Sequence, residues 1–239
     1  MPKLIFFLKK KINRLKVSKN YMKILYLLHK IFGETNPGNI NFDFTDKPTR
    51  IEIIQSIINK KKYTSYLEIG TFNDELFSKI ECEKKVGVDP FSGGTVRKTS
   101  DDFFKDNNDK FDCIFIDGLH EYHQVKKDIN NAITILNHDG IIMVHDCLPS
   151  SVYAQTIHRC TYIWNGNVWK ALVEKRTKKN LDCYTCYADQ GIGVIFNREN
   201  KNILEINFSN FLKLRYKDFY KDHKNLMNII NYDELMKKI

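Results

Sequence analysis

Glycine and proline are sparse in this chain of 239 residues, at 11 and 5, which argues against a fibrous or low-complexity protein. Long apolar runs are absent as well. No window reaches the ~18 uninterrupted apolar residues of a membrane-spanning helix. The apolar run at residues 4–8 is shorter than the ~7–15 residues at the centre of a secretory signal peptide. The sequence therefore predicts a cytoplasmic protein that does not cross a membrane.

Acidic residues are missing from the first 30 positions, which contain nine lysines and arginines. This segment alone carries a charge of +9, equal to the net charge of the whole chain. The remaining residues are neutral, with 29 basic and 29 acidic side chains. A nucleic-acid-binding domain usually has a basic surface, so we expect no nucleic-acid partner.

The six cysteines are scattered, at positions 82, 113, 147, 160, 183 and 186. A scattered set in an intracellular chain predicts reduced thiols. Cys183 and Cys186 form a C-x-x-C pair without a second pair or a flanking histidine. Structural thiols are therefore favoured over a zinc site at this pair.

Three regions are expected along the chain: a basic helical appendage with its linker at 1–47, the main domain at 48–200, and a helical extension at 201–239. Helical spacing of apolar residues predicts amphipathic helices over 3–17 and 21–32. Two interpretations of residues 1–32 remain open. The segment either makes peripheral contact with the anionic inner face of a membrane, or packs on protein as a lid or as the contact of a homodimer.

The main domain alternates strand-like and helical patterns, which is typical of an α/β fold. Near-continuous apolar runs predict buried parallel strands, and the runs lie at 65–69, 85–89, 111–117 and 140–146. Helices are expected at 48–61, 121–137 and 168–178, and strands at 181–187 and 192–197. The last two strands are joined by a short turn and suggest an antiparallel pair at the sheet edge. The predicted architecture is a doubly wound, mostly parallel sheet.

In such a sheet, ligands bind beyond the carboxyl ends of the strands. The first predicted strand ends in Glu68-Ile69-Gly70-Thr71, where a glycine lets the backbone approach a ligand. A G-x-G-x-x-G motif is absent, which argues against a dinucleotide site. Asp89 follows 21 residues after Glu68, a spacing that suits an acid that binds a ribose diol. The alternative is that Asp89 only caps a turn.

Three further groups of polar residues follow later strands or begin a helix. Ser100 and Asp101 follow Thr99 in a helix N-cap pattern, or else they contact an adenine edge. Asp117 with His120, and His145 with Asp146, lie at two neighbouring strand ends. Such a set can hold a divalent cation or orient a base. The alternative is that these residues only cap loops and satisfy hydrogen bonds.

Taken in order, the segments LEIGTF, KVGVDPF, TSDDFF, FDCIFIDGLHEYHQVKKDI and GIIMVHDCLPSS resemble the class I S-adenosylmethionine-dependent methyltransferases. They are most similar to a bacterial subgroup often associated with modification of sugars and surface glycans. WNGNVWKALVEKR and YADQGIGVIF also resemble this subgroup, so the resemblance covers roughly residues 48–197. One departure is Asp74, where the family usually has glycine. Because Asp tolerates the left-handed backbone conformation better than most residues, we expect an altered loop with binding retained.

The resemblance implies a Rossmann-like fold that binds S-adenosylmethionine. It assigns the methionine portion to Glu68 and the Gly70-Thr71 turn, the ribose to Asp89 and the adenine to Ser100 and Asp101, with Asp117 also at the cofactor. For methyl transfer to a hydroxyl oxygen, two routes of proton removal stay open. His145, supported by Asp117 and Asp146, acts as base, or a divalent cation such as Mg²⁺ is held by Asp117 and Asp146 with His120 or His145.

The expected acceptor is a small molecule or a glycan-linked sugar. Trp164 and Trp169 either form a wall for the acceptor or only pack. Two other hypotheses remain. One is a nucleotide-binding or S-adenosylmethionine-binding module without methyl transfer. The other is a peripheral membrane-associated binding protein driven by the basic terminus.

Overall fold

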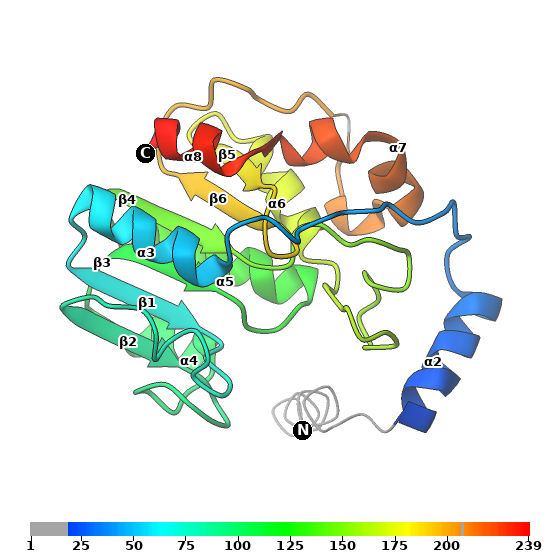
Figure 1. The fold of residues 1–239 in the computed structure, drawn as a ribbon, viewed down its shortest axis with the longest axis horizontal. Helices are drawn as coiled ribbons and strands as arrows, with labels where there is room; N and C mark the ends of the chain where they lie inside the picture. The colour runs from blue at the N-terminus through cyan, green and yellow to red at the C-terminus, as the bar shows by residue number, and fades with distance from the viewer. Residues whose placement is uncertain (1–18, 207) are drawn as a thin grey trace.

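The computed structural model describes residues 19–206 and 208–239, and the helix predicted for 3–17 lies outside them. Seven strands form one sheet in the order β2-β1-β3-β4-β6-β5-β7 (Figure 1). The strands are β1 (Ser65–Ile69), β2 (Lys84–Val88), β3 (Phe111–Ile116), β4 (Leu136–Val144), β5 (Asp182–Cys186), β6 (Ile192–Phe196) and β7 (Ile229–Ile230). Among them only β6 runs antiparallel to its neighbours. The prediction of a doubly wound, mostly parallel sheet is confirmed.

Helices α3 to α8 cover both faces of this sheet, and α2 stands at the margin of the molecule (Figure 1). The helices are α2 (Lys19–Phe32), α3 (Arg50–Lys61), α4 (Ser100–Asp106), α5 (Tyr122–Thr134), α6 (Trp169–Arg176), α7 (Tyr216–Met227) and α8 (Tyr232–Lys238), with a 3-10 turn at Phe211–Lys213. Alternate strand residues point to opposite faces: Leu67 and Ile114 pack in the core with α4 to α7, whereas Tyr66 and Phe115 pack in the core with α3 and α8. The domain therefore has three layers, with the sheet between two layers of helices.

Two details of the strands differ from the prediction. The helix expected over 121–137 ends at Thr134, and Leu136 begins β4 by pairing with Phe111. Leu136 continues the helical spacing of α5, so periodicity alone could not separate the two elements. The expected antiparallel edge pair forms, but β6 lies inside the sheet between β4 and β5. The edge is β7, which covers the open side of β5 and satisfies its backbone groups.

The helix predicted to open at Pro48 instead begins at Arg50, after an N-cap at Thr49. Thr49 and Glu52 form a reciprocal capping box, which satisfies the free backbone N–H groups of the first turn. The buried face of α3 consists of Ile53, Ile54, Ile57 and Ile58. This cap places the first residue of α3, Arg50, beside the carboxyl ends of the strands, where it contacts Asp189.

Asp112, near the start of β3, ties three strands together. Its Oδ2 accepts hydrogen bonds from the backbone N–H groups of Thr64 and Ser65, each at 3.0 Å, and from the Ser65 hydroxyl at 2.8 Å. Its Oδ1 accepts from the Asn137 amide at 2.7 Å. These hydrogen bonds fix the amino ends of β1, β3 and β4 and thereby the register of their functional ends.

Candidate functional site

The chain reverses its winding between β1 and β3. From β1 it moves outward to β2, and it then returns to β3 and β4 on the other side. Such a switch point leaves a crevice at the carboxyl ends of the strands, where ligands bind in open α/β sheets. Glu68, Gly70 and Thr71 follow β1 here, and Asp117 follows β3.

Gly70 brings the loops after β1 and β3 into direct contact. Its φ is +95°, and a Cβ atom placed on it would lie 2.3 Å from the carbonyl oxygen of Asp117. The backbone N–H of Asp117 donates to the carbonyl of Ile69 at 2.8 Å. A side chain at position 70 would therefore push these two loops apart, which explains the glycine in physical terms.

Asp74 adopts the left-handed conformation that the sequence suggested, with φ of +62°. Its Oδ1 accepts a hydrogen bond from the backbone N–H of Gly94 at 2.6 Å. The carboxylate therefore joins the loop after β1 to the loop after β2, a contact that a glycine at position 74 cannot make.

Asp89 is fully buried at the end of β2. Its Oδ1 accepts from the N–H groups of Phe91 and Ser92 at 2.8 and 3.2 Å, and its Oδ2 accepts from the N–H of Phe72 at 3.2 Å. The carboxylate therefore caps the turn that follows β2. A ribose diol would have to compete with these backbone donors for the carboxylate oxygens.

Glu68 and Thr71 are buried at the carboxyl end of β1. Burial raises the pKa of Glu68 to about 8, although a hydrogen bond from the Tyr66 hydroxyl at 2.8 Å opposes the rise. Glu68 is therefore largely protonated near neutral pH and can donate as well as accept a hydrogen bond. Among the described residues, the buried Thr71 hydroxyl has no hydrogen-bond partner, which leaves a polar group available to a ligand.

Ser100 and Asp101 begin α4, after the N-cap Thr99. The Gln124 amide donates to the Ser100 hydroxyl at 3.2 Å and to Oδ1 of Asp101 at 3.0 Å. Lys127 lies 2.8 Å from Oδ2 of Asp101. These contacts match the helix-cap interpretation and also join α4 to α5.

Asp117, His120 and Asp146 come together beyond β3 and β4, and one potential ligand atom from each lies within 4.8 Å of the others. Nε2 of His120 is 3.3 Å from Oδ1 of Asp117, and its Nδ1 is 3.1 Å from Oδ2 of Asp146. Two carboxylates and an imidazole form a donor set that suits a divalent cation.

His145 lies on the other side of the same carboxylates. Its Nδ1 is 3.5 Å from both Asp117 and Asp146, and its Nε2 is 3.2 Å from Oδ1 of Asp189. The backbone N–H of Arg50 donates to Oδ2 of Asp189 at 2.8 Å. Sequence reasoning missed Asp189 and Arg50; the only signal was the polar turn 187–191 between the last two predicted strands.

The charges in this cluster stabilise one another. Burial disfavours the protonated ring of His145, but the carboxylates of Asp146 and Asp117 outweigh burial and hold its pKa well above the usual 6.5. Burial likewise opposes ionisation of Asp117, yet the positive charges of His145 and His120 hold its pKa below the usual range. At neutral pH the protonated ring of His145 is favoured. His145 can therefore act as a base only after it has released that proton.

Trp164 and Asn165 complete the cluster. Sequence reasoning had considered Trp164 but had missed Asn165. Trp164 stacks on His120, with ring centroids 4.6 Å apart and planes 12° apart. Asn165 is fully buried and donates to Oδ1 of Asp146 at 2.9 Å. Within the described chain, the side-chain oxygen of Asn165 has no hydrogen-bond partner. Trp169, in contrast, is fully buried against Phe219 in the core, so the packing alternative holds for it.

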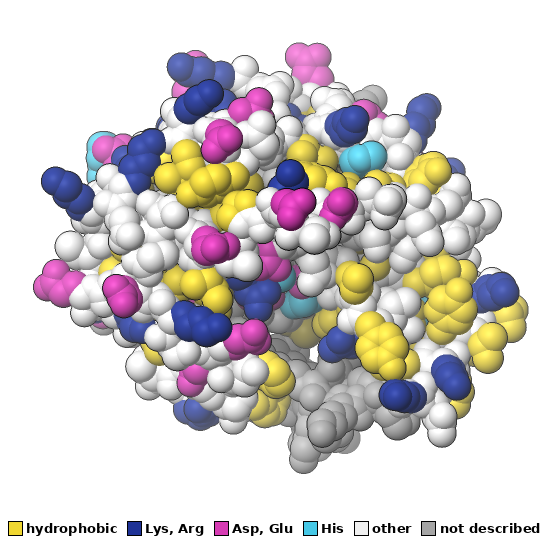
Figure 2. All heavy atoms as spheres, viewed as in Figure 1, with side chains coloured by type: hydrophobic (Ala, Val, Ile, Leu, Met, Phe, Trp, Pro, Cys, Tyr) yellow, Lys and Arg dark blue, Asp and Glu magenta, His cyan; other side chains and the backbone are white. Residues whose placement is uncertain are grey.

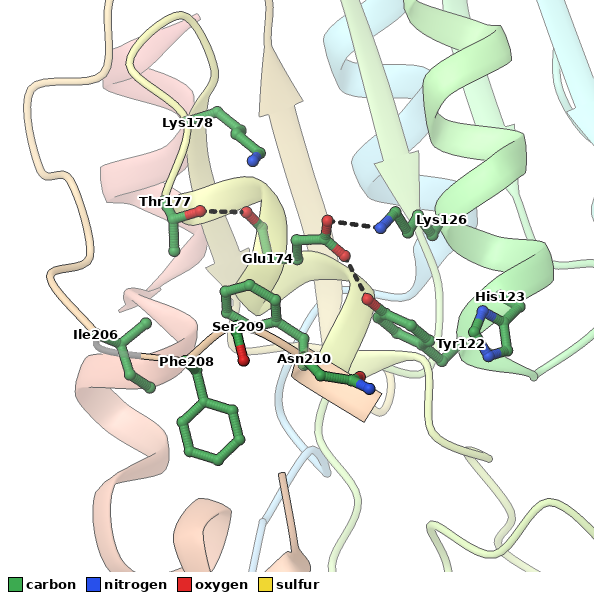
Figure 3. Close-up of a pocket in the computed structure, with 11 residues that line it drawn as sticks. Tyr122, His123, Lys126, Glu174, Thr177, Lys178, Ile206, Phe208, Ser209 and Asn210 are labelled. Atoms are coloured by element: carbon green, nitrogen blue, oxygen red, sulfur yellow. Dashed lines mark hydrogen bonds and ion pairs between the residues drawn. The ribbon is translucent and has the colours of Figure 1, made fainter. Parts of the chain in front are cut away.

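A separate polar pocket lies between α5, α6 and the residues 206 and 208–211 (Figure 3). Glu174 bridges two α5 residues in it, accepting a hydrogen bond from the Tyr122 hydroxyl and lying 2.7 Å from Nζ of Lys126. The pocket includes neither the carboxylates nor the histidines of the cluster. Tyr122 itself is buried at the start of α5.

The arrangement brings the ends of four strands into one region. Beside the cluster of Asp117, His120, His145 and Asp146, the loops after β1 and β3 meet at Gly70, and the buried Thr71 hydroxyl is without a hydrogen-bond partner among the described residues. The cluster can hold a cation or move a proton. Its place at the switch point of the sheet makes it a candidate active site.

A family model described as a methyltransferase domain matches residues 79–147. The matched segment runs from before β2 to just after β4 and includes Asp89, Ser100, Asp101 and the four cluster residues. No curated protein matches the chain.

Several solved structures are similar to the chain at low identity. Cofactor-bound Rv0187 from MTB is 14% identical with a TM-score of 0.49, and the alignment covers 74% of this chain and 96% of that one. SAH-bound methyltransferase PaMTH1 from Podospora anserina is 13% identical with a TM-score of 0.48, over 83% and 95%. The O-methyltransferase TomG from Streptomyces achromogenes in complex with SAM is 11% identical with a TM-score of 0.46, over 82% and 96%. Similarities this low assign no activity to this chain.

Proposed function

We propose that the protein is an S-adenosylmethionine-dependent methyltransferase that methylates a hydroxyl oxygen. The observation that carries this proposal is the methyltransferase-domain match over 79–147, which contains Asp89 and the whole cluster of Asp117, His120, His145 and Asp146. The ordered motifs over residues 48–197 support it, and we assign the catalytic unit to 48–200.

The cofactor would lie at the carboxyl ends of β1 and β2, next to the switch point. Gly70 lets the loops after β1 and β3 meet there, because a Cβ at this position would strike the backbone of Asp117. Among the described residues the buried Thr71 hydroxyl has no hydrogen-bond partner, and Glu68 is buried near the end of the same strand. In this proposal Glu68, Gly70 and Thr71 hold the methionine portion of the cofactor. Asp89 holds the ribose, and Ser100 and Asp101 hold the adenine. Asp117 also lies at the cofactor.

When bound, S-adenosylmethionine supplies the methyl group from its sulfonium. The protein aligns the acceptor oxygen with that group and removes the hydroxyl proton. One route uses His145 as the base, with Asp117, Asp146 and Asp189 holding the ring. Asn165 holds Asp146, which lies beside His145, and Trp164 holds His120, so the groups around the base keep a fixed arrangement.

The second route uses a divalent cation such as Mg²⁺. The donor set fits, because two carboxylates and His120 converge within 4.8 Å. Asp117 and Asp146, with His120 or His145, would hold the ion, which would lower the pKa of the acceptor hydroxyl.

The proposed acceptor is a sugar or a glycan-linked sugar, and the motif resemblance supports this choice. Trp164, which lies beside the cluster, offers an aromatic face of the kind that sugars stack on. The test is a product screen with S-adenosylmethionine carrying a labelled methyl group against glycans and small hydroxylated compounds. Label in a sugar hydroxyl is the expected result, and label only on nitrogen or in non-sugar acceptors would contradict it.

The alternative of a binding module without catalysis makes a different prediction. Calorimetry with S-adenosylhomocysteine tests cofactor binding without any acceptor. Saturable binding is expected, and its absence would overturn the methyltransferase proposal. Saturable binding combined with no transfer across the whole acceptor screen would favour the module.

A further inference from the structure

Helix α2 has an exposed apolar face. Met22, Leu25, Tyr26 and His29 are half-buried, and Tyr26 packs on Tyr153 with ring centroids 4.4 Å apart. On the opposite side, Ile24, Leu27, Leu28, Ile31 and Phe32 are exposed. They follow the i, i+3, i+4, i+7 spacing of one helix face. We call these five residues the apolar stripe.

The body of the protein fixes the direction in which the apolar stripe points. Just after α2, Glu34 accepts hydrogen bonds from the backbone N–H of Tyr216 at 2.7 Å and from the Gln155 amide at 3.2 Å. Together with the Tyr26–Tyr153 contact, these bonds hold α2 against the body at one end and along one side. Figure 1 shows α2 standing at the margin of the molecule.

The loop 157–163 adds to this apolar surface. Ile157, Tyr162 and Ile163 are exposed by 41, 70 and 57%, and Tyr162 lines a groove together with Tyr26 and Leu27. Among the described large apolar side chains that are more than half exposed, only Phe72 lies outside α2 and this loop. Figure 2 shows hydrophobic side chains interspersed with Lys and Arg at the lower right, over α2. Exposed apolar surface concentrated in this way marks an interaction site.

A row of lysines borders the apolar stripe. Lys19, Lys23 and Lys30 are exposed and lie along one edge of it by helical spacing. The sequence places six more cations in residues 1–18 and no acid before residue 34. The partner therefore has to offer negative charge together with an apolar region that the side chains of the stripe can enter.

We propose that the apolar stripe and the loop 157–163 dock on an anionic membrane surface, with α2 lying in the interfacial plane. Apolar side chains would enter the headgroup region while the lysines contact anionic lipids, and Tyr162 suits the interface. No described helix is long and apolar enough to cross the bilayer. This proposal does not depend on methyl transfer.

Charge disfavours two other occupants of the stripe. A symmetric contact with a second copy through α2 would place Lys19, Lys23 and Lys30 of both chains together without an acid from this segment. Covering the stripe with residues 1–18 would add further cations beside the same lysines. Like charges held together cost free energy, whereas anionic lipids neutralise them.

The test is co-sedimentation of the full chain with vesicles of phosphatidylcholine alone or mixed with phosphatidylglycerol. We expect binding to the anionic vesicles, weakened by salt, and little binding to the neutral ones. I31S should weaken partitioning about tenfold, since it removes one buried aliphatic side chain. Its control is I203S, at a residue that is also exposed but lies far along the chain, and it should change partitioning less than twofold.

Replacing Lys19, Lys23 and Lys30 together by Gln should weaken binding to anionic vesicles about a hundredfold, at about fivefold per lysine. The matched control replaces Lys217, Lys221 and Lys224, which are exposed on α7. Thermal unfolding of each variant shows that the fold is retained.

Three outcomes would overturn the proposal: no binding to anionic vesicles, equal binding to both vesicle types, or binding that the α2 variants leave unchanged. Light scattering that shows a dimer dissociated by I31S, without vesicle binding, would assign the stripe to a second copy instead.

Discussion

The ring of Trp164 lies parallel to the imidazole of His120, with centroids 4.6 Å apart. The edge of that imidazole points at carboxylates on both sides, Asp117 and Asp146. The indole N–H of Trp164 donates to the carbonyl of Thr156, which fixes the indole plane. Trp164 therefore holds His120 in the one orientation in which both ring nitrogens face a carboxylate.

Removing the indole should release His120. We expect W164A to lower turnover by up to about tenfold, the scale of an aromatic contact, and to leave S-adenosylhomocysteine affinity nearly unchanged. W164F keeps an aromatic face and should therefore lose less turnover than W164A. Turnover and calorimetric Kd check this prediction, and equal losses in W164A and W164F would contradict the stacking role.

Asp89 should be essential for cofactor affinity. D89A removes a buried carboxylate that orders the loops after β1 and β2, so we expect Kd for S-adenosylhomocysteine to rise at least about tenfold, as for loss of charged hydrogen bonds. Because Asp89 also caps a turn, the melting temperature should fall as well. D106A removes an exposed partner of Lys98 and serves as control. An unchanged Kd in D89A would rule out the assigned role.

His145 and Asp146 should matter more for turnover than for binding. Loss of a general base costs about 10²–10⁴ in rate, so we expect H145A and D146A to lower kcat strongly while Kd for S-adenosylhomocysteine stays within about threefold. H138A, at a histidine that is 95% exposed, is the control. If neither H145A nor D146A alters turnover, their catalytic assignment is wrong.

Chelation separates the two activation routes. If a cation acts, removing it should abolish turnover, and adding Mg²⁺ back should restore it, whereas D117N and D146N should no longer respond to Mg²⁺. Calorimetric titration of Mg²⁺ into wild type and D117N provides a readout besides activity. Full turnover by protein shown to be metal-free would leave His145 as the base.

Asp112 should make the free energy of unfolding depend on pH. Burial opposes its ionised form, but hydrogen bonds from Asn137 and Ser65 outweigh burial and lower its pKa. A carboxyl whose pKa is lower in the folded state stabilises the fold above its unfolded pKa of about 3.9, and this contribution is lost as pH falls through the folded value.

We therefore expect D112N to be less stable than wild type by about 1–3 kcal/mol at pH 7. The difference in the free energy of unfolding between wild type and D112N should narrow as pH falls below about 4. At such pH the Asp112 carboxyl of wild type is protonated, so neither protein carries a charge at this position. Urea unfolding at pH 7, 5, 4 and 3 measures this difference. D109N, at a carboxylate more than half exposed, is the control. A gap that stays constant down to pH 3 would show that the charge of Asp112 does not act this way.

The sequence by itself determined the sheet and most of its strand-end residues. Buried parallel strands require continuous apolar runs, so β1, β2 and β3 were visible within a residue at either end. Polar residues that follow such strands must gather at one edge of the sheet. For that reason the sequence alone groups Asp117, His120, His145 and Asp146.

Only the tertiary structure decided what surrounds that group. Asp189, Arg50 and Asn165 reach it from the β5–β6 turn, the start of α3 and a loop before α6, and no local pattern links positions so far apart in sequence. The structure also separated Trp164, stacked at the site, from Trp169, buried in the core. It showed as well that α2 buries one side and exposes the other. These outcomes depend on which elements pack together, and packing is a property of the whole chain, whereas periodicity is a property of a short segment.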